Sequence, residues 1–239
     1  ELNRLVNVGE DDIEAQLKMA DRIICGVQFV AQIGKPTPVR EIALLAKARD
    51  LYVIGDFCEG HGAGFIDDES EKLGAPGPNF FTRFNYADHF CDAAIYSFFA
   101  AHMIVAGEGG MICTDDDEIA ALCRSIKCHG YGPGPRFTFA RVGYNSKMNE
   151  LTAAIGLEGL EKFDETFVKR RENRAKLIDH LSRFEDRLIL YRDALGEVIA
   201  PHAFPIVLRD PEGDVMPLYR HLEESGVQCK TLFGSLPTQ

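Results

Sequence analysis

The sequence predicts an α/β fold, and two groups of expected elements support this prediction. Residues 22–29 and 51–55 have the apolar character of buried strands, and residues 38–48 between them have the periodicity of a helix, which gives a βαβ unit. A buried strand over residues 93–98 then runs through a short connection and a glycine-rich turn into a second apolar strand over 111–114. Ligands of open α/β sheets bind just past the carboxyl ends of strands, so chemistry is expected where the 93–98 strand ends.

The spacing of apolar residues and the positions of glycine, proline and aspartate predict the other elements. The helix over 38–48 carries its apolar residues on one face: Val39, Ile42, Ala43 and Ala46. A helix is expected over 116–127, where the aspartates at 115–117 mark its start. Residues 129–136 contain three glycines and two prolines, which predict a mobile loop.

A long helix is expected to follow Met148. Its apolar residues keep helical spacing and predict a core face or a dimer interface: Met148, Leu151, Ala154, Ile155, Leu157, Leu160, Phe163 and Phe167. The basic run at 169–171 is interpreted as a solvated face. From about Leu181 the elements become shorter, with a strand over 203–208, a helix over 216–224 ended by Gly226, and a strand over 227–233.

Composition limits the classes of function. The 239 residues are 46% hydrophobic without a long apolar run, and no signal peptide or membrane span is visible, so a cytoplasmic protein without a membrane partner is expected. A formal net charge of −11 disfavours nucleic acid as a partner. The seven cysteines are scattered and form no C-x-x-C pair, which predicts reduced thiols, no metal site and no iron–sulfur cluster.

The stretch from Ser97 to Gly110 carries the most specific signal, because it places Ser97 and His102 just past the expected strand. It resembles the "S-F-x-x-x-K-x-x-x-x-G-E-G-G" signature of the pyridoxal-phosphate-dependent sugar aminotransferases of the DegT/DnrJ/EryC/StrS family. In that family the lysine holds the cofactor as a Schiff base, and here His102 stands in its place. The same exchange is found in a branch of the family, the nucleotide-sugar 3-dehydratases that act on 4-keto-6-deoxyhexoses.

Residues 56–63, directly after the 51–55 strand, resemble the family's "E-D-x-x-Q-x-x-G" segment. The resemblance implies that Asp56 pairs with the pyridine nitrogen of the cofactor and keeps the ring protonated as an electron sink. The alternative is an aspartate that serves only the turn at the strand end. Glu59 replaces the usual glutamine beside the cofactor, and His61 is interpreted as structural.

Residues 143–148 are similar to the family's "G-Y-N-x-[RK]-M" element. The resemblance implies that Asn145 reaches the cofactor phosphate of a neighbouring subunit, and therefore that the protein is a homodimer with shared active sites. The alternative is that Asn145 caps the following helix.

The resemblance covers nearly all of the chain and implies the aspartate-aminotransferase type of fold, a mostly parallel sheet between helices with a small α+β domain. A large cofactor-binding domain is expected over 1–180 and part of a small carboxyl-terminal domain over 181–239. Residues 232–239 resemble a segment of the dehydratases, and the chain is expected to be truncated at both ends.

The first hypothesis is a dehydratase that uses pyridoxal or pyridoxamine phosphate on a nucleotide-linked 4-keto-6-deoxyhexose, with an amino donor such as glutamate. His102 would take a proton from the cofactor methylene, and the hydroxyl at carbon 3 would leave. Histidine suits this role because an ordinary imidazole is largely neutral at pH 7. The alternatives are an aminotransferase that works without lysine, and an inactive family member that acts as a scaffold.

Overall fold

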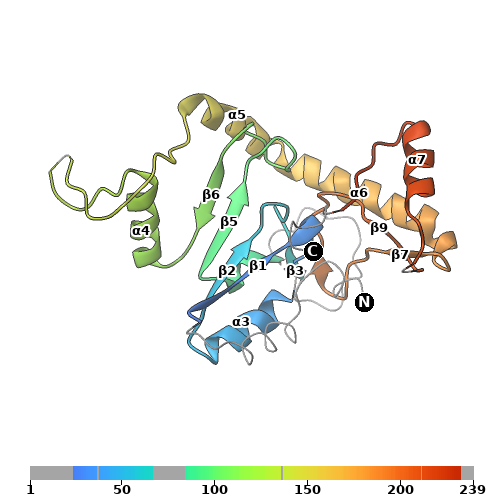
Figure 1. Cartoon of the computed structure of the whole chain (residues 1–239), viewed down its shortest axis with the longest axis horizontal. Coiled ribbons are helices and arrows are strands. Elements are labelled where there is room, and N and C mark those ends of the chain that lie inside the picture. Colours follow the sequence, from blue (N-terminus) through green and yellow to red (C-terminus); the bar gives the residue numbers. More distant parts are fainter. Residues whose placement is uncertain (1–23, 37, 67–83, 136, 211, 233–239) are drawn as a thin grey trace.

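The computed structural model describes residues 24–36, 38–66, 84–135, 137–210 and 212–232. Its central sheet has the strand order β1-β2-β5-β6, with the bounds β1 Gly26–Val30, β2 Tyr52–Asp56, β5 Ala93–Ser97 and β6 Gly110–Cys113 (Figure 1). Strands β1, β2 and β5 are parallel, and β6 pairs with β5 in the antiparallel direction. The predicted α/β fold with a mostly parallel sheet is therefore confirmed.

The register aligns the carboxyl ends of the parallel strands. Val30 of β1 lies opposite Asp56 of β2, and Asp56 lies opposite Ile95 of β5. The segments that follow these strands consequently start from one edge of the sheet. This is the edge at which the sequence predicts the chemistry.

Helix α3, Val39–Lys47, packs on the sheet as the predicted amphipathic helix (Figure 1). Its residues Val39, Ile42 and Ala46 have no exposed surface and join the core cluster around Phe29 and Phe57. The burial of this stripe confirms the predicted βαβ unit, although residues 22 and 23 of the first expected strand lie outside the described residues.

The remaining elements, in chain order, are η1 Gln32–Gly34, β3 Gly64–Ile66, β4 Phe84–Tyr86, η3 Ala87–Phe90, α4 Asp117–Lys127, α5 Glu150–Glu161, α6 Phe163–Leu181, η4 Ser182–Phe184, β7 Leu188–Leu190, β8 Glu197–Val198, β9 Ile206–Leu208 and α7 Met216–Glu224. Two small sheets accompany the central one, with the orders β4-β3-β8 and β7-β9. Strand β8 thus pairs with β3, which lies on the other side of the predicted domain boundary at 180. The division into 1–180 and 181–239 stays a prediction. Within the described residues, no helix combines the length and the apolar character that a membrane-spanning segment needs.

Helix termini follow the local signals. Asp116 caps α4 by accepting hydrogen bonds from Glu118 N and Ile119 N at 2.8 and 2.9 Å. The predicted helix over 216–224 is confirmed as α7, and Gly226 follows it with φ +80°. The long helix expected after Met148 is present as α5 and α6, which are separated at Lys162.

Two strand predictions near the carboxyl end need correction. The strand expected over 203–208 begins only at Ile206, because Pro205 has no N–H to donate to a ladder. The strand expected over 227–233 is absent from 227–232, and residue 233 lies outside the described part. There the chain folds back on α7, where Val227 N donates to Leu222 O and Cys229 N donates to Glu223.

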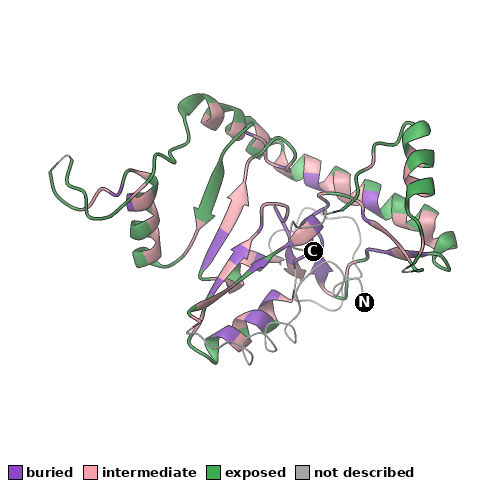
Figure 2. Ribbon diagram, in the orientation of Figure 1, coloured by how far each residue is buried: buried purple, intermediate pink, exposed green. Residues whose placement is uncertain are grey.

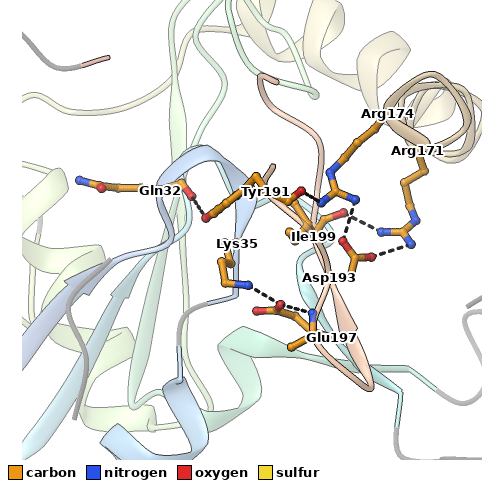
Figure 3. A network of polar contacts seen from close by, with 9 residues as sticks. Gln32, Lys35, Arg171, Arg174, Tyr191, Asp193, Glu197 and Ile199 are labelled. Carbon is orange, nitrogen blue, oxygen red and sulfur yellow. Dashed lines mark hydrogen bonds and ion pairs between the residues drawn. The ribbon is translucent and has the colours of Figure 1, made fainter. Parts of the chain in front are cut away.

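A buried polar network joins three parts of the chain (Figure 3). Lys35, just after η1, forms an ion pair with Glu197 of β8, and both side chains are less than 10% exposed. Glu197 Oε2 also accepts from Ala194 N at 2.8 Å. On the other side, Asp193 pairs with Arg171 and Arg174 of α6 at 3.0 and 2.7 Å.

The same network corrects the interpretation of the basic run at 169–171 as a solvated face. The Arg171 side chain is 11% exposed and donates to Ile199 O at 2.9 Å. Arg170 is partly buried and donates to Pro201 O and His202 O at 3.2 and 3.4 Å. Both guanidinium groups bind the segment that follows β8, because its carbonyl oxygens lie beside α6 and need donors.

Replacing Lys35 by Met should lower the free energy of unfolding by about 3–5 kcal/mol, because it leaves Glu197 as an unpaired buried charge. The double variant Lys35→Met/Glu197→Gln should recover most of this loss, since a glutamine oxygen can still accept from Ala194 N. Chemical denaturation measures both effects. Lys162→Met breaks an exposed pair with Glu158 and is the matched control with little change; equal losses at the two lysines would contradict this account.

Candidate functional site

The candidate site lies past the carboxyl ends of β2 and β5. Asp56 ends β2, Ser97 ends β5, and His102 lies in the loop that leads to β6. Hydrogen bonds between main-chain atoms hold this loop: His102 N donates to Phe99 O at 3.0 Å, and Ala106 N donates to Phe98 O at 2.8 Å. The loop therefore presents His102 from a fixed backbone.

Two constraints explain the glycines of the loop: positive φ angles and a close contact with the neighbouring strand. Gly107 and Gly109 have φ values of +84° and +145°, which L side chains rarely adopt. At Gly110, a Cβ atom would lie 2.8 Å from Tyr96 O of the neighbouring strand. The glycine-rich end of the stretch is thus required for the chain to enter β6.

Aromatic rings surround His102. The ring centroids of His202, Phe99 and His61 lie 5.2, 6.0 and 6.1 Å from that of His102. The Nδ1 atom of His102 is buried, and within the described part of the chain it has no hydrogen-bond partner.

The surroundings keep His102 neutral. Burial lowers its pKa below 6.5, while the negative charges of Glu59 and Asp56 act in the opposite direction. A neutral imidazole has a lone pair and can accept a proton, so His102 is in the form that a general base needs at pH 7.

His61, which sequence reasoning interpreted as structural, lies under His102. It is only 4% exposed, and its ring lies 5.3 Å from that of Tyr96. Burial lowers its pKa to about 4, and the neighbouring imidazoles of His102 and His202 act in the same direction.

The two predicted carboxylates of the site are held by main-chain donors. Asp56 Oδ1 accepts from Cys58 N at 3.0 Å, which is the turn contact proposed as the alternative role of this residue. The other lone pairs of a carboxylate stay available for a second partner. Glu59 Oε2 accepts from Ile33 N at 2.6 Å, and its Oε1 lies 3.7 Å from His202 Nε2.

Ser97 and Asn145 have different surroundings. Ser97 Oγ accepts from Phe99 N at 3.2 Å at the start of the loop. Asn145 lies opposite Cys128 in an isolated antiparallel bridge, and its Oδ1 accepts from Lys147 Nζ at 2.6 Å. The helix cap considered as its alternative role belongs to Asn149, whose Oδ1 accepts from Thr152 N.

Sequence reasoning missed His202. This residue follows β8, far along the chain from His102, and no motif or periodicity marks it. The structure brings Asp56, Glu59 and His102 within electrostatic reach of one another and adds His61 and His202 to them.

Comparison with known proteins gives one family for almost the whole chain. Residues 4–239 match the DegT/DnrJ/EryC1/StrS aminotransferase family. A similar protein is the GDP-perosamine synthase of Caulobacter vibrioides, 29% identical over 98% of this chain and 66% of that protein.

The 3-dehydratases named by the sequence resemblance are also among the similar proteins. The GDP-4-keto-6-deoxy-D-mannose 3-dehydratase of Escherichia coli O55:H7 is 26% identical over 95% of this chain and 58% of that protein. A solved structure of the E. coli 3-dehydratase with bound hydrated PLP has a TM-score of 0.73 and 25% identity, over 94% of this chain and 56% of that one. The chain thus spans roughly half to two thirds of the length of these relatives, and the aspartate-aminotransferase type of fold is confirmed.

His61→Phe should reduce the loss of stability on acidification. The folded protein protonates His61 only near pH 4, whereas the unfolded chain does so near 6.5. The contribution of His61 to the free energy of unfolding is therefore complete above pH 6.5. About 2–3 kcal/mol of it is lost as the pH falls from 6.5 to 4. Thermal or urea unfolding as a function of pH measures it, and His221→Gln, on the exposed surface of α7, is the control that keeps the wild-type slope. An unchanged slope in His61→Phe would show that this imidazole is not held neutral.

Proposed function

Because the chain belongs to the DegT/DnrJ/EryC1/StrS aminotransferase family, we propose that it is a cofactor-dependent enzyme that removes the hydroxyl at carbon 3 of a nucleotide-linked 4-keto-6-deoxyhexose. The cofactor is pyridoxal or pyridoxamine phosphate, and an amino donor such as glutamate replenishes its amine. The observation that carries this proposal is the place of His102, which lies in the loop between β5 and β6 with a buried Nδ1. We also propose that the protein is cytoplasmic, as the sequence predicts.

The residues around His102 fit such a cofactor. Asp56 stands at the carboxyl end of β2 with one oxygen held by Cys58 N, so its carboxylate is oriented and can accept a ring N–H. Within the described residues, no hydrogen bond occupies the buried Nδ1 of His102. When bound, the cofactor supplies an amine for the 4-keto group and a ring that acts as an electron sink.

The protein residues then have defined tasks. Asp56 would hold the proton on the ring nitrogen of the cofactor, and Glu59, which is anchored by Ile33 N, would be a further residue that contacts the cofactor. His102 accepts a proton and can return it to the departing hydroxyl, because its imidazole titrates below 6.5 and exchanges protons readily near neutral pH.

The rival function is transfer of an amino group to the same class of ketosugar. The similarity to a GDP-perosamine synthase favours it. The sequence of the loop argues against this function. No lysine occurs between Ser97 and Lys127, and Lys127 belongs to the last turn of α4, so the loop offers no lysine to hold the cofactor. A cofactor that is not held by a lysine is better suited to elimination than to repeated transfer.

We also propose that the enzyme is a homodimer that shares its active sites. Helix α5 contains no buried residue, and four of its apolar side chains are more than half exposed: Leu151 at 80%, Ile155 at 53%, Leu157 at 63% and Leu160 at 56% (Figure 2). A surface of this kind is typical of an interface.

The segment before α5 extends the same exposed surface. Its large apolar residues are mostly exposed, namely Phe137, Phe139, Val142, Tyr144 and Met148. Asn145 lies among them, so a second copy packed on this surface would receive Asn145 at its own site. This arrangement supports the role that the resemblance implies for Asn145, the binding of the cofactor phosphate of the neighbouring subunit.

Replacing His102 separates the two functions. His102→Lys should decrease dehydration by about 10²-fold or more, because general-base catalysis is worth about 10²–10⁴-fold and the lysine is free to bind the cofactor covalently. Some amino-sugar product should appear. His102→Asn cannot take up a proton and should lose dehydration without this gain.

The assay uses the full-length protein, glutamate and a panel of nucleotide 4-keto-6-deoxyhexoses, and it follows ammonia and the 3-deoxy-4-ketosugar by mass spectrometry. Stoichiometric conversion by the wild type to amino sugars that keep the carbon 3 hydroxyl would refute the dehydratase and establish the aminotransferase.

Leu151→Asp should convert the dimer to monomers, because it places a charge in the proposed interface on α5. Light scattering after gel filtration measures the mass. Leu44→Asp is the matched control: Leu44 is 71% exposed on α3 and should leave the dimer intact. A wild-type monomer at micromolar concentration would rule out the shared site.

A further inference from the structure

His202 reaches His102 from the carboxyl-terminal part of the chain. Its ring centroid lies 5.2 Å from that of His102, closer than the rings of Phe99 and His61. The two planes are tilted by 43°, so the contact is not a parallel stack. No sequence motif marks this residue.

The backbone of His202 is held on both sides. Arg170 Nη1 of α6 donates to His202 O at 3.4 Å and to Pro201 O at 3.2 Å. Ala200 N donates to Gly34 O at 2.8 Å, and a Cβ at Gly34 would come within 1.6 Å of Ala200 O. The close approach of these two segments fixes where the His202 side chain begins.

One edge of the His202 ring faces Glu59. His202 Nε2 lies 3.7 Å from Glu59 Oε1, and the other oxygen of Glu59 is held by Ile33 N at 2.6 Å. A fixed carboxylate favours the proton on the ring nitrogen that faces it. The position of Glu59 therefore favours a proton on Nε2 of His202, which leaves Nδ1 as an acceptor on the other side of the ring.

We propose that His202 is a positioning residue that decides which ring nitrogen of His102 carries the proton. His102 Nδ1 is buried and makes no hydrogen bond within the described residues, and a small rotation of the two adjacent rings lets it donate its hydrogen to His202 Nδ1. The lone pair of His102 then stays on Nε2, the nitrogen that takes up the proton in the reaction. The use made of this lone pair rests on the proposed function, but the tautomer itself does not.

The charges around the pair are compatible with this arrangement. The groups that face the two imidazoles are the carboxylates of Asp56 and Glu59, the guanidinium of Arg170, and His61. Burial lowers the pKa of both His102 and His202, and the carboxylates oppose it. Both rings are therefore neutral at pH 7, as a hydrogen bond from one imidazole to the other requires.

The tautomer can be measured directly in the full-length protein with ¹⁵N-labelled histidine, because long-range ¹H–¹⁵N spectra distinguish a protonated Nδ1 from a protonated Nε2. The loss of one set of signals in His102→Asn assigns His102. We expect the proton on Nδ1 in the wild type. A wild-type His102 with its proton on Nε2 overturns the proposal without any variant of His202.

Two variants then test the acceptor. Asparagine places its amide oxygen at about the position of Nδ1, whereas glutamine places its amide at about the position of Nε2. His202→Asn should keep the wild-type tautomer of His102, and His202→Gln should lose it and lower kcat about 10-fold to 100-fold with KM little changed. His221→Gln on exposed α7 is the control and should change neither the tautomer nor kcat.

The other outcomes contradict the proposal. If His202→Asn and His202→Gln both keep the tautomer of His102, or both lose it equally, an acceptor at the position of His202 Nδ1 does not determine that tautomer. If His61→Gln changes the tautomer and His202→Gln does not, the partner of His102 is His61. The spectra need no substrate, so a protein that fails to dehydrate ketosugars but shows the expected tautomers refutes the proposed function and leaves this inference standing.

Discussion

The ion pair between Lys35 and Glu197 is the contact on which the arrangement of the site depends. It lies in a region with little access to water, so each charge would be costly alone and the two side chains must stay together. The pair ties the turn after β1 to β8 (Figure 3). The pairing of Asp193 with α6 then fixes the other end of the same segment. The chain is therefore held at Asp193 and again at Glu197 before it continues to His202.

Burial affects the pKa values of the histidines in the site more than the neighbouring charges do. His102 and His202 lie near carboxylates, which by themselves would favour their protonated forms. The loss of hydration outweighs this attraction, and the pKa of each imidazole falls below its ordinary value. The same environment would lower the pKa of a lysine, but an imidazole reaches the neutral form at a smaller cost because its ordinary pKa is already near 7. A histidine is thus the side chain that this site can use as a base without a large change in pKa.

The distribution of burial divides the molecule into two parts (Figure 2). The region around β1, β2 and α3 has a closed core, with Phe29 and Phe57 almost fully buried. By contrast, β6 and α5 keep large apolar side chains exposed, among them Met111 and Leu151. Isolated exposed apolar residues need no explanation, but a continuous group of them favours a protein surface that a partner covers. The proposed second subunit accounts for both the exposure and the position of Asn145.

The sequence alone determined the α/β class, the bounds of α7, the presence of α3 and α4 close to their predicted bounds, and the place of His102 in the loop after β5. These features depend on local patterns: the spacing of apolar residues, a capping aspartate at position 116, and glycines where φ is positive. Only the tertiary structure decided that Arg171 is mostly withdrawn from solvent and that His202 lies beside His102. Both depend on contacts between segments far apart in the chain, and such contacts leave no periodicity in either segment by itself.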